Sequence, residues 1–179
     1  ELVGVLGDTS CRTNELLEPM LEKLGALLQD AIESTDGRFR NLTEALRDMF
    51  LVVDRTTDGK ELLLREFGAA AGRLTEALVH ALNVELLNSP PPTFAKGIDR
   101  LRNSTFNSGR AKDAWISKWF HSYLHTLRVL RNECAHTYDP EPRQKQFPRD
   151  LEQEDLLLLV VALRRVLLMY NQWRRESPD

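Results

Sequence analysis

Hydrophobic residues recur every three or four positions along most of the chain, which is the spacing of one face of an α-helix. The stripe is clearest in six stretches that are separated by polar, glycine-containing or proline-containing breaks. These stretches cover residues 13–33, 38–53, 60–88, 94–102, 112–136 and 150–175. No segment shows the alternating apolar and polar pattern of a half-buried strand. The pattern therefore predicts an all-α fold, an antiparallel helical bundle.

The Thr-Thr-Asp-Gly break at residues 56–59 is the expected boundary within this bundle. We expect residues 1–57 to form an N-terminal helical extension and residues 58–179 to form the bundle proper. Gly68 and Gly72 fall inside the long predicted helix 60–88, where each costs about 1 kcal/mol of helix propensity. Their spacing predicts that a neighbouring helix approaches closely at that point.

The end of the predicted helix 112–136 carries the residues with the most chemical potential. Arg131 offers a permanent positive fork for phosphate, and His136 is the side chain best suited to moving protons near neutral pH. Asn132 lies four positions before His136 and shares its helix face. Arg131 and His136 are roughly 140° apart on an ideal helix. They can converge only if the helix loosens near His136 or if a second subunit completes the site.

The spacing Arg131-Asn132-x3-His136 resembles the signature of the HEPN family (higher eukaryotes and prokaryotes nucleotide-binding domains). In that family an Arg, often followed by Asn, precedes a His by four to six residues. The resemblance covers residues 58–177, and Tyr138 extends it towards the HEPN toxins that are paired with minimal nucleotidyltransferase antitoxins. This chain is longer than such toxins and has an N-terminal helical pair that they lack.

The resemblance implies a homodimer that cleaves RNA without metal or cofactor, as a toxin or antiviral defence effector. The use of cysteine, which does not suggest a disulfide framework, favours a reducing cytoplasm. The resemblance also implies an antitoxin, or other domains of a longer polypeptide, as further partners. In this interpretation His136 is the general base or acid, Arg131 stabilises the phosphorane and Asn132 orients His136 or the phosphate. One His and one Arg cannot easily fill all these roles, whereas two copies across a twofold axis can.

A non-enzymatic interpretation stays open beside the ribonuclease. In it Arg131 caps helix carbonyls or pairs with Glu133 or Asp139, and the domain is a dimerisation or adaptor module within a larger protein. Tyr138 could bind substrate or receive a nucleotidyl group, or it could plug the junction between helix and loop. His125 and Arg128 lie near Asn132 on the helical grid and could line the same cleft.

Two further groups of residues have both a functional and a structural interpretation. His121 and His125 form an H-x-x-x-H pair on one helix face, but no third ligand is obvious in the sequence, so we expect no metal. A basic cluster precedes the motif helix, with two aromatic residues close behind. It could steer and stack a single strand, or it could be a solvated loop with Trp119 in the core. The residues are Arg100, Arg102, Arg110, Lys112, Trp115 and Trp119.

Composition adds limits to these expectations. The formal net charge of −3 gives no global basic field, so any RNA contact must come from a local patch. The two cysteines, Cys11 and Cys134, do not suggest a disulfide framework, and Cys134 falls on an apolar helix face. The longest uninterrupted apolar run, Leu156–Val161, is far below the roughly 20 residues that span a membrane. The start at Glu1 suggests a piece of a longer polypeptide without a signal peptide.

Overall fold

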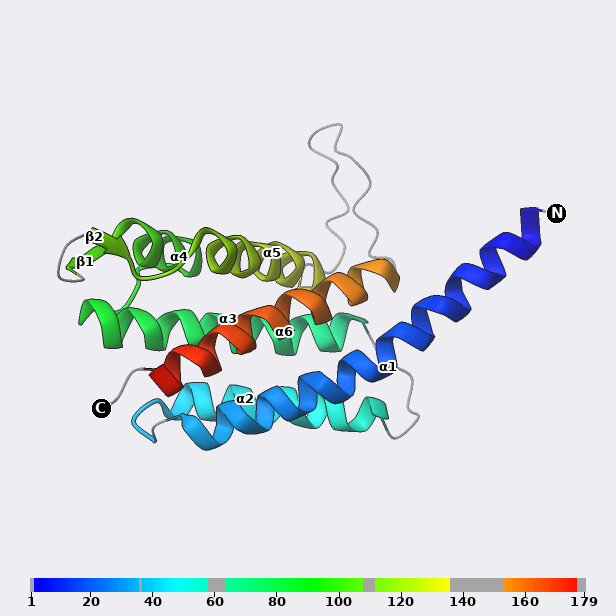
Figure 1. The fold of residues 1–179 in the computed structure, drawn as a ribbon, viewed down its shortest axis with the longest axis horizontal. Helices are drawn as coiled ribbons and strands as arrows, with labels where there is room; N and C mark the ends of the chain where they lie inside the picture. The colour runs from blue at the N-terminus through cyan, green and yellow to red at the C-terminus, as the bar shows by residue number, and fades with distance from the viewer. Residues whose placement is uncertain (1, 36, 58–63, 108–111, 136–152, 177–179) are drawn as a thin grey trace.

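The computed structural model describes residues 2–35, 37–57, 64–107, 112–135 and 153–176, which form a bundle of helices (Figure 1). The helices are α1 (Leu2–Ser34), α2 (Arg40–Thr57), α3 (Leu64–Leu87), α4 (Phe94–Asn103), α5 (Lys118–Ala135) and α6 (Gln153–Glu176). Two short strands, β1 (Thr105–Asn107) and β2 (Lys112–Ala114), pair antiparallel. The all-α prediction is confirmed, and the small hairpin is a detail that the hydrophobic pattern did not predict.

The helices close into a ring around one apolar core. α1 packs on α2, α2 on α3, α3 on α5 and α5 on α6, while α6 contacts both α1 and α3 (Figure 1). The contacts of α6 with α1 and with α3 are parallel, and the other neighbouring pairs in this order run antiparallel. Every helix contributes to a single hydrophobic cluster, including Leu24 of α1 and Leu46 of α2. The division at residues 57 and 58 falls at the edge of a stretch outside the described residues and stays a prediction.

Two predicted helix starts are wrong, each for a local reason. α5 begins at Lys118 rather than at residue 112, because Ser117 caps it: the Phe120 amide donates to the Ser117 hydroxyl at 3.2 Å. Residues 112–114 belong instead to β2. α1 begins at Leu2 rather than at residue 13 and runs through Thr13 and Asn14, residue types that often cap helices. Short polar residues are tolerated inside a helix at a cost of a few tenths of a kcal/mol, so cap-type residues alone do not mark a start.

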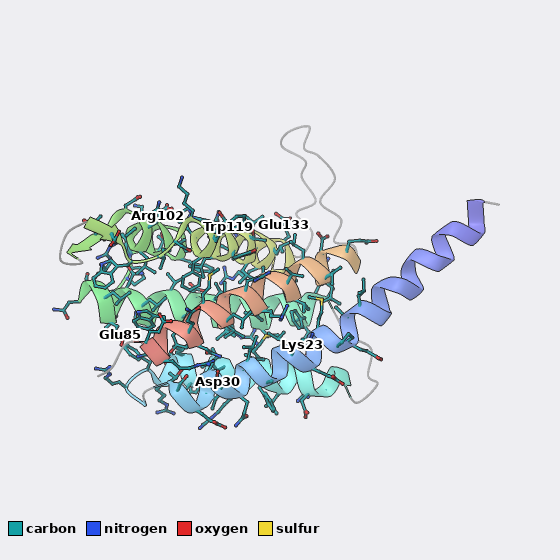
Figure 2. All side chains as sticks on the ribbon, in the orientation of Figure 1. Lys23, Asp30, Glu85, Arg102, Trp119 and Glu133 are labelled. Atoms are coloured by element: carbon teal, nitrogen blue, oxygen red, sulfur yellow. The ribbon has the colours of Figure 1, made fainter. Side chains whose placement is uncertain are left out.

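A polar network joins the C-terminal end of α6 to α1 and α3. The Asn171 amide donates to the Leu27 carbonyl at 3.0 Å. The Arg174 guanidinium donates two hydrogen bonds to the Glu85 carboxylate, at 2.9 and 3.1 Å. Both members of this pair are largely shielded from water, which is where such a paired geometry matters for stability. Asp30 of α1 and Glu85 of α3, both labelled in Figure 2, therefore connect their helices to the C-terminal end of α6.

α5 lies directly against the backbone of α3, as the two glycines predicted. A Cβ on Gly72 would overlap Cγ of Arg131 and lie 2.6 Å from its Cβ. A Cβ on Gly68 would overlap Sγ of Cys134 and lie 3.0 Å from its Cβ. The prediction that these glycines allow close helix approach is confirmed. The contact also buries Cys134, which packs as a small hydrophobic residue as expected.

The last helix, α6, is long and apolar enough to cross a membrane, judged by length and composition alone. Residues Glu154–Glu176 contain an 18-residue window that is apolar enough, although no uninterrupted apolar run is long. Half of that window is buried inside the bundle, and the core helix of a soluble protein passes the same test. Many of its apolar residues, among them Leu163 and Val166, are fully buried in the shared core.

The glycine contacts predict opposite effects for two Gly→Ala substitutions. Gly72→Ala forces Arg131 or the whole of α5 to move, so we expect the free energy of unfolding to fall by about 1–3 kcal/mol. Gly25→Ala, in α1, is the matched control: its Cβ would meet only Val53 Cγ1 at 3.8 Å. Better helix propensity should raise the stability of that variant by about 0.5–1 kcal/mol. Urea denaturation measures both, and equal effects of the two substitutions would contradict the close-packing argument.

Candidate functional site

The motif arginine is fixed at the C-terminal end of α5. Its Nη2 atom donates to Glu76 Oε2 of α3 at 3.2 Å, and its Nη1 atom donates to Asn132 Oδ1 at 3.4 Å. The side chain is 35% exposed, so the guanidinium remains open to solvent on one side. His136 and Tyr138 lie outside the described residues. The structure therefore brings Arg131 and Asn132 together and leaves their relation to His136 as a prediction.

The position of this guanidinium follows from the helix contact beneath it. The Cβ and Cγ of Arg131 lie on Gly72, and Glu76 is one turn further along the same face of α3. The guanidinium of Arg131 therefore emerges from the contact between α3 and α5 next to the carboxylate of Glu76. The expectation that a structural role would pair Arg131 with Glu133 is wrong, because the observed partner is Glu76. Asp139, the other expected partner, lies outside the described residues.

A basic groove begins at the same carboxylate. It has a volume of about 410 Å³ and runs between the start of α2 and the middle of α3. Its walls include three arginines, Arg38, Arg40 and Arg73, against the single carboxylate of Glu76. The full lining is Arg38, Phe39, Arg40, Asn41, Leu42, Arg73, Glu76, Ala77, His80 and Ala81. Glu76 takes part both in the lining of the groove and in the ion pair with Arg131, and the charge of the groove suits an anionic ligand.

A second polar cluster joins α4 to the first half of α5. Nε2 of His121 and Nε2 of His125 each lie 3.1 Å from Oδ1 of Asp99. The two rings meet edge to face, with centroids 4.5 Å apart. All three side chains are partly open to solvent, Asp99 most of all. Asp99 offers a third possible ligand atom beside the histidine pair, which was not obvious from the sequence.

α4 presents Asp99 to α5 because its rotation is fixed from the other side. The buried Asn83 of α3 donates to the carbonyl of Gly97 at 3.0 Å, and Ile98 and Leu101 point into the core. A Cβ on Gly97 would lie 2.8 Å from Val79 and from Pro91, so this face can approach α3 only because residue 97 is glycine. Thr93 caps the helix by accepting from the Lys96 amide at 3.2 Å. With this rotation of α4, the side chain of Asp99 faces α5.

Charge and hydrogen bonds set the protonation of this cluster. The hydrogen bond from His121, then that from His125, lowers the pKa of Asp99 below its ordinary value. Nδ1 of His125 accepts a hydrogen bond from Arg128 Nε at 3.3 Å. A neutral His125 therefore carries its proton on Nε2 and donates it to Asp99. Arg128 and His125 contact each other, and along the helix Arg128 lies about one turn (roughly 6 Å) and His125 about two turns (roughly 10 Å) from Asn132.

The predicted basic and aromatic cluster is only partly assembled. Trp119 is 70% exposed and stacks near Tyr123, so the interpretation that places Trp119 in the core is wrong. Figure 2 shows Arg102 and Trp119 along the edge formed by α4 and α5. Arg100 turns away to donate to the Pro90 carbonyl at 3.0 Å. Arg110 and the side chain of Lys112 lie outside the described part of the chain.

Two functional candidates could not have been found from local sequence. Glu76 follows Gly72 by four positions, so the glycine spacing could have marked it as a neighbour of the approaching helix, but not as the partner of Arg131. Asp99 has no such mark, since it stands among charged residues on a short amphipathic helix. The groove arginines come from the turn before α2, from α2 and from α3, and they show no spacing pattern.

Comparison with known proteins identifies no relative. No family model, no curated protein and no solved structure matches the chain. We therefore infer the function from the side chains and their geometry.

The hydrogen bonds to Asp99 predict how its carboxyl group titrates. Since its folded pKa is depressed, Asp99 stabilises the fold above its unfolded pKa, and this contribution is lost as pH falls through the folded pKa. His121→Ala removes the largest cause, so the pKa of Asp99 should rise towards that of an ordinary aspartate. His80→Ala changes a histidine outside the cluster and should leave it unchanged. Carboxyl ¹³C NMR titration measures both, and a pKa unaffected by His121→Ala would show that the hydrogen bond is not formed in solution.

Proposed function

We propose that the chain is a metal-independent endoribonuclease of the HEPN type that acts as a homodimer. The observation that carries the proposal is the guanidinium of Arg131, which is hydrogen-bonded to Asn132 and to Glu76, a residue that also lines the basic groove. Arg131 and Asn132 are the first two residues of the motif, and His136 follows directly after α5. A role as a toxin or antiviral effector rests on the resemblance of the motif alone, and a place in the cytoplasm rests on the use of cysteine.

The chemistry requires three groups around one phosphate. A base removes the proton of the ribose 2′-hydroxyl, whose oxygen attacks the phosphorus. The bond to the 5′-oxygen breaks, and an acid returns a proton to that oxygen. The products are a 2′,3′-cyclic phosphate and a 5′-hydroxyl. Arg131 stabilises the negative charge of the phosphorane, and His136 from each of two subunits would supply the base and the acid. The groove arginines would hold the flanking phosphates.

The shared site needs α5 and α6 at a twofold interface. Val129 of α5 is 47% exposed and Leu158 of α6 is 46% exposed, although both are large apolar residues. The two helices contact each other, so one partner surface could cover both residues. The partner that covers this surface would be a second copy of this chain. An Arg and a His roughly 140° apart on an ideal helix do not face the same phosphate, so a second subunit has to complete the site.

A dimerisation or adaptor module is the second candidate, and one observation favours it. The stem of Arg131 packs on Gly72 and its head group pairs with Glu76, so Arg131 has a complete structural role without RNA. The two functions make different demands on Arg131. An adaptor needs its packing, whereas a ribonuclease also needs its charge.

Substitution of the motif residues tests the catalytic proposal. His136→Ala should abolish RNA cleavage, while far-UV circular dichroism and melting temperature stay near those of the wild type. Arg131→Gln keeps Cβ and Cγ on Gly72 but removes the charge, so it should lose about 10²–10³ in cleavage rate, as when a transition-state donor is removed. Wild-type cleavage should persist in excess chelator and leave 2′,3′-cyclic phosphate ends. A wild-type dimer that cuts no RNA would favour the adaptor.

Mixed dimers test whether the site is shared. A heterodimer of wild type with His136→Ala has a single His136 and should be inactive if the base and the acid come from different subunits. A heterodimer of wild type with Arg131→Gln keeps both histidines and one arginine, so it should retain part of the activity. If each subunit held a complete site, both heterodimers would keep about half of the wild-type activity. A wild-type protein that cleaves RNA as a strict monomer would contradict the shared site.

A further inference from the structure

We propose that Asp99, His121 and His125 form a binding site for one divalent transition-metal ion of the zinc class. The three side chains come from two helices and converge on one point. One ligand atom from each lies within 4.8 Å of the other two. This site is separate from the motif at the end of α5 and does not depend on the proposed ribonuclease.

The geometry requires little rearrangement to accept a metal. Zinc binds imidazole nitrogen at about 2.0–2.1 Å and carboxylate oxygen at about 2.0–2.2 Å, so tetrahedral ligands stand about 3.3–3.5 Å apart. Oδ1 of Asp99 is already 3.1 Å from each Nε2 atom. The histidines are one helical turn apart on α5, which holds both rings on one side. The three ligand atoms all lie within 4.8 Å of one another, so side-chain movements without a change of the backbone can bring them to this spacing.

The ligand set selects the class of ion. Two imidazoles suit Zn²⁺, Ni²⁺ or Cu²⁺, whereas Mg²⁺ and Ca²⁺ prefer oxygen ligands. Three protein ligands leave at least one position for water or another group. Because His121 and His125 are 29% and 26% exposed and Asp99 is 52% exposed, the ion can enter and exchange from solvent. The carboxylate is held ionised, as a metal ligand must be.

One neighbour opposes metal binding. Arg128 donates to Nδ1 of His125, which keeps the ring proton on Nε2, the atom that would bind the metal. Binding therefore requires that this proton moves to Nδ1 and that Arg128 turns away from the ring. Its positive charge also repels the ion. The site is consequently one in which a metal competes with an arginine, and removal of Arg128 should strengthen binding.

Binding would join α4 to α5 and stabilise the fold. A ligand that binds only the folded chain adds stability according to its concentration relative to its dissociation constant. At a hundredfold excess over that constant, the melting temperature should rise by about 5–10 °C for a chain of this size. Since protons compete for the same imidazole nitrogens, the affinity should fall as the solution is acidified.

Isothermal titration of the chelator-washed full chain with zinc chloride tests the proposal. Wild type should bind one ion. His121→Gln and Asp99→Asn each remove a ligand and should weaken binding at least about 100-fold, beyond the 10–100-fold cost of losing a supporting residue. His80→Gln, an exposed histidine of α3 outside the cluster, is the matched control and should bind as the wild type does. Circular dichroism verifies that each variant is folded.

Arg128→Met is an independent test. It predicts tighter zinc binding, and a loss of folding could not produce that result. This variant should bind zinc more tightly than the wild type and show a larger rise in melting temperature with the ion. The proposal is overturned if wild type binds no zinc stoichiometrically, if His121→Gln binds as well as wild type, or if His80→Gln loses the ion instead. Unchanged or weaker binding by Arg128→Met would overturn the competition between arginine and metal.

Discussion

The packing of α5 against the bare backbone of α3 is the contact on which the arrangement of chemical groups depends. Gly72 lets the stem of Arg131 lie flat on α3, so that its guanidinium emerges beside Glu76. Gly68 does the same for Cys134, whose thiol pKa is raised by burial and which serves packing rather than reactivity. A side chain at either glycine would push α5 outward. The pairing of Arg131 with Glu76, which also lines the basic groove, would then be lost.

The fold was largely predictable because helical periodicity is a local property. The six helices appear where apolar residues recur with helical spacing, and the proline run after Ser89 separates α3 from α4. The errors have a different origin. The β1–β2 hairpin is three residues long on each side, too short for an alternating pattern to appear. Ser117 starts α5 because its hydroxyl meets a backbone amide, which the apolar stripe does not report.

The sites were predictable only in part because they join distant segments. Adjacent Arg131 and Asn132 could be recognised, and so could the one-turn spacing of His121 and His125. Periodicity shows which face of a helix is buried, but not which row of one helix lies opposite which row of the next. Asp99 reaches the histidines because Asn83 and Gly97 fix the rotation of α4. These contacts are single events that leave no repeating pattern in the sequence.

The acidic net charge of the chain is a weak argument against binding to RNA. At physiological ionic strength, charges on the surface are screened beyond about 8 Å. A phosphate in the groove would therefore respond to Arg38, Arg40 and Arg73, which line it, rather than to the formal charge of −3. Arg40 forms an ion pair with Glu44, and Arg38 forms one with Glu85. Ion pairs of exposed arginines such as these are weak. An incoming phosphate can compete for these arginines at little cost, so local arrangement outweighs the total charge.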